Sequence, residues 1–457
     1  MSRLLKSRYA PLVWLAVAWM TGALTAEVPE MALLIGLGAL GWGLWRTLIR
    51  RNKGGEAHLY AGFIVGAEVY FRMAFVGLPW EFGKISVFLL LGLGWLVRPF
   101  GKPIPLIFVI YLLLLLPGVF VPEWSSIEAF KKEFMFTFFG EVVLVVAMLY
   151  FYKRKMEEEE LLRLLRWMVL GVVMTSGMLF MKVPDYATIH YGGGSNFAAS
   201  GGFGPNQVSA ILGLGIVLTG YSLLVGKKLF VWRALDLALL TLFALQGLFT
   251  LSRGGLMAAA LALALAVAAV YLNNPSQALR LLSIKPWKIL LLAVLMAFAF
   301  NLANEVSRGA VERRYFNVDQ YGQQIKEDYT TKRGDIVKDD WHTFLTHFIT
   351  GAGIGGGRAY RAQNTGISAA HVELSRLPAE HGILGLLALL ILLFYPVWTF
   401  FKVKNTMTRF TLTLFTAYAV LTMTHNAIRL AMPSFLYGAG FVWIILSQKM
   451  RRNADEA

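Results

Sequence analysis

The chain has 457 residues, of which 57% are hydrophobic and 15% are charged, and it carries a formal net charge of +16. Soluble domains are about one quarter charged, so this composition excludes an ordinary soluble protein and is typical of a chain that crosses a membrane many times. The sequence has no cysteine, which excludes disulfides, thiolate metal sites and cysteine nucleophiles.

The apolar residues lie in about fourteen blocks, each long enough to cross a bilayer with some tilt. The first block follows a basic N-terminal segment and is interpreted as a retained span rather than a signal peptide. The block at 58–79 holds Glu68 and Arg72, and the block at 83–97 is short, so twelve or thirteen spans is the alternative count. The predicted fold class is an all-α polytopic membrane protein. The predicted spans lie at 10–26, 31–48, 58–79, 83–97, 104–121, 134–152, 161–181, 204–225, 230–250, 255–272, 287–303, 382–401, 409–426 and 431–448.

Basic residues concentrate in alternate connections between these spans. With the N-terminus in the cytoplasm, the cytoplasmic connections include "RTLIRRNK", "YKRKMEEEELLRLLR", "GKKLFVWR" and "KVKNTMTR", whereas the short external connections are poor in Lys and Arg. The positive-inside rule therefore predicts that both termini are cytoplasmic. We assign the positive charge to orientation and to contact with anionic membrane lipids, not to nucleic-acid binding.

Three regions follow from this topology. Residues 1–303 hold the first eleven spans, residues 304–380 form a large external loop, and residues 381–457 hold the last three spans. Connections of this length are usually functional. We expect a small, mainly helical cap on the outer face of the membrane.

The stretch "GFGPNQVSA" places Asn206 and Gln207 at the outer mouth of a span, directly after a proline that marks its start. An amide there can bind a sugar hydroxyl or cap the helix, and capping is the favoured interpretation. Both residues are supporting candidates for a substrate site.

The stretch "FTLSRGGLMAA" joins two spans on the external side and places Arg253 at the membrane surface. Thr250 and Ser252 can cap the following helix, and Gly254 and Gly255 let the backbone approach a ligand closely. A helix N-terminus beside an arginine is suited to phosphate. The alternative is an arginine that extends to the lipid headgroups, and the residues alone do not decide between the two.

The stretch "TTKRGDIVKDDW" places Lys332 and Arg333 in the large external loop, ahead of an amphipathic segment. Taken alone, it is best explained as a solvated run of charge.

The stretch "AAHVELSRLPAEHGILG" places His371 shortly before the last long apolar block. Proline fits the first turn of a helix but not its middle, so Pro378 is predicted to separate this turn from the following span. A neutral histidine can accept a proton from a hydroxyl, although a lone histidine more often packs as an interfacial ring. Glu373, Arg376 and Glu380 follow at intervals of three and four, so they can share one helix face, where Glu380 orients His371 or pairs with an arginine.

The stretch "THNAIRLAMP" places His425 and Arg429 on another external turn, where they can add to the wall of a pocket. Sequence motifs for ATP, zinc or dinucleotide binding are absent, so no cofactor is expected. An enzyme built on this chain needs an activated donor that is carried in the membrane.

The order of these motifs resembles the O-antigen ligase and polymerase superfamily. The motifs are "GPN" at a span mouth, "SRGG" between two spans, "KRG" and "GAGIGGG" in the long loop, and "AEHGILGL" after His371. The resemblance covers about residues 200–400 and implies a bacterial membrane glycosyltransferase of surface polysaccharide assembly. Val372 departs from the family pattern, in which many members have asparagine after this histidine.

The resemblance implies an inverting, metal-independent transfer at the periplasmic face of the inner (cytoplasmic) membrane. The donor is a glycan on undecaprenyl pyrophosphate. Arg253 and Arg333 match arginines that hold the pyrophosphate, and His371 matches the histidine that activates the acceptor hydroxyl. A chain-length regulator protein is a further candidate partner.

Three functions remain open at this point. A polymerase joins lipid-linked repeat units of O-antigen or exopolysaccharide, and Arg376, the "EHG" ending and fourteen spans favour it. A ligase moves the finished glycan to the lipid A core. The third hypothesis is a flippase for lipid-linked oligosaccharides, and it is supported mainly by Glu68 and Arg72 inside a span.

Overall fold

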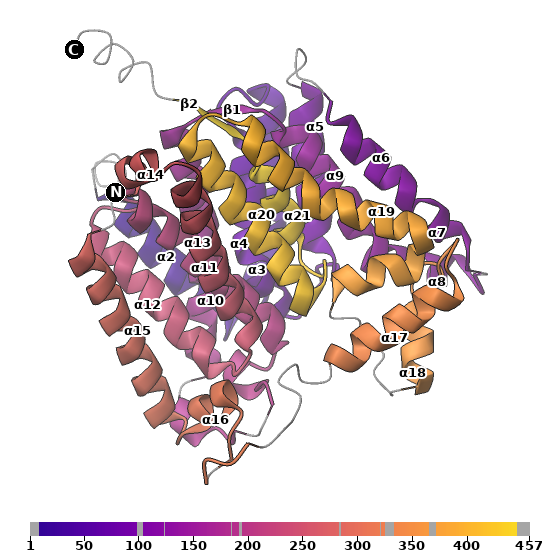
Figure 1. Cartoon of the computed structure of the whole chain (residues 1–457). Coiled ribbons are helices and arrows are strands. Elements are labelled where there is room, and N and C mark those ends of the chain that lie inside the picture. The colour runs from indigo at the N-terminus through magenta and orange to yellow at the C-terminus, as the bar shows by residue number, and fades with distance from the viewer. Residues whose placement is uncertain are drawn as a thin grey trace.

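The computed structural model describes residues 9–97, 104–122, 124–183, 185–191, 194–282, 285–319, 321–324, 333–364 and 372–445. Within these residues the chain is 77% helical, with almost no sheet, as predicted for an all-α protein (Figure 1). The longer elements are α2 (Ala10–Thr25), α3 (Glu30–Ile49), α4 (Glu56–Met73), α5 (Phe82–Val97), α6 (Leu106–Leu115), α8 (Ile127–Glu133), the π-helical turn η1 (Phe134–Phe138), α9 (Phe139–Phe151), α10 (Glu158–Lys182), α11 (Pro205–Val225), α12 (Arg233–Phe249), α13 (Arg253–Asn273), α15 (Pro286–Val306), α17 (Arg333–Thr346), α18 (Gly356–Asn364), α19 (Glu373–Lys402), α20 (Thr406–Asn426) and α21 (Ala431–Ala439). The shorter ones are α7 (Pro117–Phe120), α14 (Pro275–Leu281), α16 (Ala310–Phe316), η2 (Tyr186–Thr188), η3 (Ala198–Ser200), β1 (Lys155–Glu157) and β2 (Trp443–Ile445).

Seven helical segments of the described chain are long and apolar enough to cross a membrane. They are α3, Ile127–Phe151, α10, α11, α13, α15 and α19. Shorter apolar helices occupy the predicted spans at 10–26, 83–97 and 104–121, and α4, α12, α20 and α21 lie in the remaining blocks. The structure thus supports a membrane protein, and the count of fourteen spans stays a prediction.

The last predicted span is wrong as a continuous helix. The helix α21 ends at Ala439, and the chain then forms strand β2, which pairs in parallel with β1. Gly438 and Gly440 weaken the helix, and the β-branched residues that follow favour a strand.

The helices form one bundle around a continuous apolar core. Along its length, α10 packs against α2 and α4, α13 packs against α11 and α20, and α21 packs against α9. These contacts are close because small residues face them: a Cβ on Gly66 of α4 would lie 2.0 Å from the backbone oxygen of Met168 in α10. In Figure 1, α16, α17 and α18 lie at one end of the bundle, and the β1–β2 pair and α14 lie at the opposite end.

The segment between α15 and α19 is mainly helical where it is described, as predicted, and its position on the outer face of the membrane stays a prediction. It contains α16, α17 and α18, and the glycine-rich stretch between α17 and α18 lies against α19. The backbone N–H of Gly353 donates to Glu380 O at 2.9 Å, and that of Ile383 donates to Phe348 O at 2.8 Å.

The helix α19 is interrupted at Gly382, not at Pro378 as predicted. Pro378 lies inside the helix, whereas Gly382 has φ 61° and ψ −144°, a conformation that only glycine adopts readily. A Cβ at Gly382 would lie 2.5 Å from Ile349 O, so the glycine-rich stretch also needs this position to be small. The predicted boundary at residues 380 and 381 therefore falls inside α19, directly before the kink.

Candidate functional site

Two adjoining cavities lie between α8, η1, α18 and the α20–α21 turn; the first residues of α19 close the inner one, and the α4–α5 connection and α5 border the outer one. The inner one has a volume of about 20 Å³, which is room for about one water molecule. The outer one measures about 600 Å³. Both are lined by Glu133, Phe136, Arg358 and Arg429, so the two cavities share a wall.

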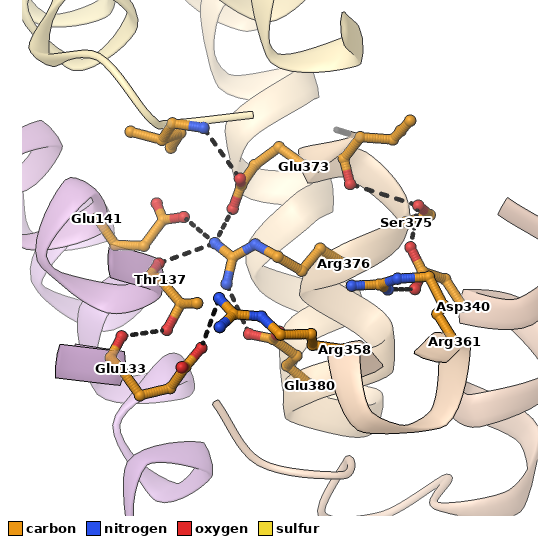
Figure 2. A network of polar contacts seen from close by, with 12 residues as sticks. Glu133, Thr137, Glu141, Asp340, Arg358, Arg361, Glu373, Ser375, Arg376 and Glu380 are labelled. Carbon is orange, nitrogen blue, oxygen red and sulfur yellow. Dashed lines mark hydrogen bonds and ion pairs between the residues drawn. The ribbon is translucent and has the colours of Figure 1, made fainter. Parts of the chain in front are cut away.

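Arg376 is the centre of a buried polar network beneath the inner cavity (Figure 2). Its side chain is 4% exposed and forms ion pairs with Glu373 and Glu380 of its own helix. It also pairs with Glu141 of α9 at 3.3 Å and donates to Thr137 O at 3.0 Å. The predicted shared face of the three α19 residues is therefore present, and it serves to join α19 to α9.

The π-helical turn η1 supplies backbone acceptors to this network. A π-turn shifts the hydrogen-bond register of a helix by one residue, and such turns are frequent at functional sites. Thr137 O accepts from Arg376, and Met135 O accepts from Lys84 Nζ at 3.2 Å. Two buried cations therefore hold this turn, from which Phe136 reaches the cavity.

Arg358 and Arg429 both lie over the ring of Phe136. Their guanidinium carbons are 4.8 Å and 5.5 Å from the ring centroid, within cation–π range. Arg358 also pairs with Glu133 at 3.2 Å. Burial, followed by repulsion from Arg358 and Arg72, lowers the pKa of Arg429 to about 10. Positive charge is therefore crowded at this point of the wall.

The turn that carries Arg429 is held by a charged pair in α4. Arg72 pairs with Glu68 at 2.8 Å and donates to Arg429 O at 2.7 Å. Glu68 accepts from the backbone N–H of Ala431 at 2.7 Å. The intrahelical pair predicted in this span is thus present, and both of its members position the α20–α21 turn.

A second ion pair anchors the cap to α19. Asp340 of α17 pairs with Arg361 of α18 and accepts from Ser375 Oγ at 2.6 Å. Three helices therefore meet at one buried carboxylate, which fixes α18 and the neighbouring Arg358 over the cavity.

Neither Asn206 nor Gln207 caps α11, so the favoured interpretation of these amides is wrong. Asn206 Oδ1 accepts from Ser252 Oγ at 2.8 Å, which ties α11 to the start of α13. Gln207 Oε1 accepts from Arg72 Nη1 at 2.9 Å and so belongs to the charged group behind Arg429.

Arg253 is the first residue of α13, as predicted, but the expected side-chain cap from Ser252 is absent. Ser209 of α11 replaces it, because its hydroxyl accepts from the N–H of Gly255 at 3.2 Å. A Cβ on Gly254 would lie 2.5 Å from the ring of His425. Here the two glycines allow close packing of helices, and they bring Arg253 and the buried His425 to the same end of the bundle.

The structure does not establish the side-chain positions of two predicted site residues, His371 and Arg333. His371 lies outside the described residues. Arg333 is the first residue of α17, and nothing is described of its side chain. That Arg253, Arg333 and His371 meet at one site therefore stays a prediction.

Glu133, Phe136, Arg358 and Arg361 belong to the site although they were not predicted from the sequence. Arg358 and Arg361 did carry a signal, because they follow the glycine-rich stretch at a spacing of three on an amphipathic helix. Glu133 and Phe136 carried none, since they reach the site only through the packing of α8 and η1 against residues far along the chain.

Comparison with known proteins gives one match. Residues 237–390 match the sequence profile of a protein family described as O-antigen ligase. No curated protein and no solved structure matches the chain. The matched range includes Arg253, Arg358 and Arg376 and ends shortly after the kink of α19. This part of the chain is therefore similar to the O-antigen ligase family, in agreement with the resemblance of its motifs to the O-antigen ligase and polymerase superfamily.

Proposed function

We propose that this protein is an inverting, metal-independent glycosyltransferase that polymerises O-antigen or exopolysaccharide repeat units. Its donor is a glycan on undecaprenyl pyrophosphate, which it uses at the periplasmic face of the inner membrane. The observation that carries the proposal is the family match over residues 237–390, the range that holds Arg253, Arg333 and His371.

The proposed chemistry divides between a base and cations. His371 accepts the proton of the acceptor hydroxyl, whose oxygen attacks the anomeric carbon of the donor sugar. The bond from this carbon to the pyrophosphate oxygen breaks, and the lipid pyrophosphate leaves with the electron pair. Arg253 and Arg333 stabilise the negative charge on the leaving group.

The arrangement of the polar residues supports an enzyme. Arg358 and Arg429 line a cavity at the end of the bundle where α17 and α18 lie. An excess of cations at such a place suits an anionic, lipid-linked substrate. The family match and this cavity support the same substrate class.

The acceptor distinguishes the polymerase from the ligase. Purified protein is offered lipid-linked repeat units with and without core lipid A, and the products are separated by size. A ladder of products without the core is expected for the polymerase. A single product that forms only when core lipid A is present would establish the ligase instead.

Transport is the remaining alternative, and the buried group formed by Glu68, Arg72, Glu81 and Lys84 is the observation that favours it. In the structure these residues hold α4, α5 and the α20–α21 turn together. We expect the wild type to translocate no lipid-linked oligosaccharide, and we expect Glu68→Ala to lower the stability of the protein. Loss of translocation in Glu68→Ala, with transfer intact in His371→Ala, would favour the transporter.

A further inference from the structure

The outer cavity has the features of a sugar-binding site of its own. Besides Arg358, Arg429 and Phe136, its wall includes Lys132 and Trp80. Its volume of about 600 Å³ lies within the range of about 300–1,000 Å³ that small-molecule sites occupy. Trp80 is 48% exposed, which leaves a large aromatic surface available to a ligand.

The charge of this wall is unbalanced in favour of cations. Three cationic side chains line the cavity with two carboxylates, Glu81 and Glu133. Each carboxylate already has a partner, because Glu133 pairs with Arg358 at 3.2 Å and Glu81 pairs with Lys84 at 2.9 Å. An anionic group between Arg358 and Arg429 would relieve the repulsion between these two guanidinium groups.

Two arginines on one ring make a preorganised anion site. Phe136 makes a cation–π contact with each guanidinium group, and it belongs to the π-helical turn η1. Arg72 fixes the backbone of Arg429 by donating a hydrogen bond to its carbonyl oxygen. The cations therefore lose little freedom when an anion binds, which favours tight binding.

We propose that Trp80, Phe136, Arg358 and Arg429 form a subsite for an acidic sugar of the glycan substrate, whose carboxylate or phosphate binds the two arginines. The inference rests on the proposed function, because it names the substrate class of the same enzyme. Arg253 is not among the residues that line this cavity, so the acidic sugar and the lipid pyrophosphate have separate ligands. The aromatic wall also favours a sugar ring over a bare phosphate.

The test compares three probes on the full-length protein in detergent, by isothermal titration calorimetry. Trigalacturonate carries the acidic sugar, its methyl ester keeps the rings without the charge, and inorganic pyrophosphate represents the lipid headgroup. The variants are Arg429→Gln and Arg358→Gln. Arg308→Gln is the matched control, because Arg308 is exposed on the α15–α16 turn. Arg253→Gln is included for the proposed pyrophosphate site.

We expect trigalacturonate to bind the wild type and to lose about tenfold in affinity in each cavity variant, the usual effect of removing one charge-assisted hydrogen bond. The control should bind like the wild type, and the methyl ester should bind weakly and equally throughout. Pyrophosphate binding should fall only in Arg253→Gln.

Equal trigalacturonate affinity in the wild type and both cavity variants would overturn the inference, as would no binding to the wild type. If the cavity variants lost affinity for pyrophosphate instead, the cavity would be the binding site of the lipid headgroup. If Arg253→Gln bound pyrophosphate normally while the cavity variants lost trigalacturonate, the proposed role of Arg253 would fail and the subsite would stand. Arg358 is 34% exposed, so its variant is the one expected to fold if Arg429→Gln does not.

Discussion

Among single side chains, Arg376 and Arg358 show how burial decides the role of an arginine. Arg376 lies inside the protein and pairs with three carboxylates. Arg358 is partly exposed at the cavity, where it pairs with the carboxylate of Glu133 and lies over the ring of Phe136. Removing one member of a buried ionic group leaves uncompensated charge, whereas a solvent-exposed pair contributes little.

The variant Arg376→Gln should therefore be strongly destabilised. Three buried carboxylates lose their cation, and the expected cost is about 3–5 kcal/mol. The control Arg358→Gln should cost no more than about 1 kcal/mol, because water screens the pair it breaks. Thermal unfolding in detergent measures both. Equal melting temperatures of the two variants would contradict the role assigned to Arg376.

Arg253 should not tolerate replacement by lysine if it holds pyrophosphate. A guanidinium group can bind two phosphate oxygens at once, whereas an ammonium group is a single point of charge. We expect Arg253→Lys to fold normally and to lose roughly tenfold or more in turnover with lipid-linked repeats. Wild-type turnover in this variant would indicate that Arg253 contacts the lipid headgroups of the membrane and does not hold the pyrophosphate.

Among the elements, α19 joins the cap to the membrane bundle through its kink. The residues before Gly382 belong to the polar network, and those after it form the apolar part of the helix. The sequence indicated the shared face of Glu373, Arg376 and Glu380, because helical spacing is a local property. It did not indicate the break at Gly382, since that depends on the stretch near Ile349 that packs against it.

A methyl group at Gly382 should disturb this junction. The variant Gly382→Ala combines a left-handed backbone angle with a Cβ only 2.5 Å from Ile349 O, so it should lose more than about 1 kcal/mol. Gly92→Ala in α5 is the control, because a Cβ there has open space around it and alanine favours a helix. If both variants have the same melting temperature as the wild type, the kink does not require glycine.

For the whole molecule, composition and hydrophobic blocks were enough to predict an all-α membrane protein and the approximate positions of most helices. They failed at the C-terminal end, where β2 pairs with β1 from a distant part of the chain. The cavity could not be predicted for the same reason. The sequence indicated Arg429 as a pocket residue, but its meeting with Glu133, Phe136 and Arg358 depends on packing between distant parts of the chain.

The predicted orientation can be tested directly because the chain has no cysteine. Single cysteines replace Ser126, on the predicted external side, and Lys404, on the predicted cytoplasmic side. A membrane-impermeant maleimide should label the first in intact spheroplasts and the second only after the membrane is opened. The reverse pattern would place the cavity on the cytoplasmic side.

Glycan transfer by the reconstituted protein is the measurement that bears on the proposed enzyme as a whole. Proteoliposomes that contain the wild type or His371→Ala receive lipid-linked repeat units, and chain growth is followed over time. Elongated products from the wild type, with growth abolished in a folded His371→Ala variant, are the predicted result. A wild type that elongates nothing, or a His371→Ala variant that elongates at the wild-type rate, would contradict the assignment of His371 as the base.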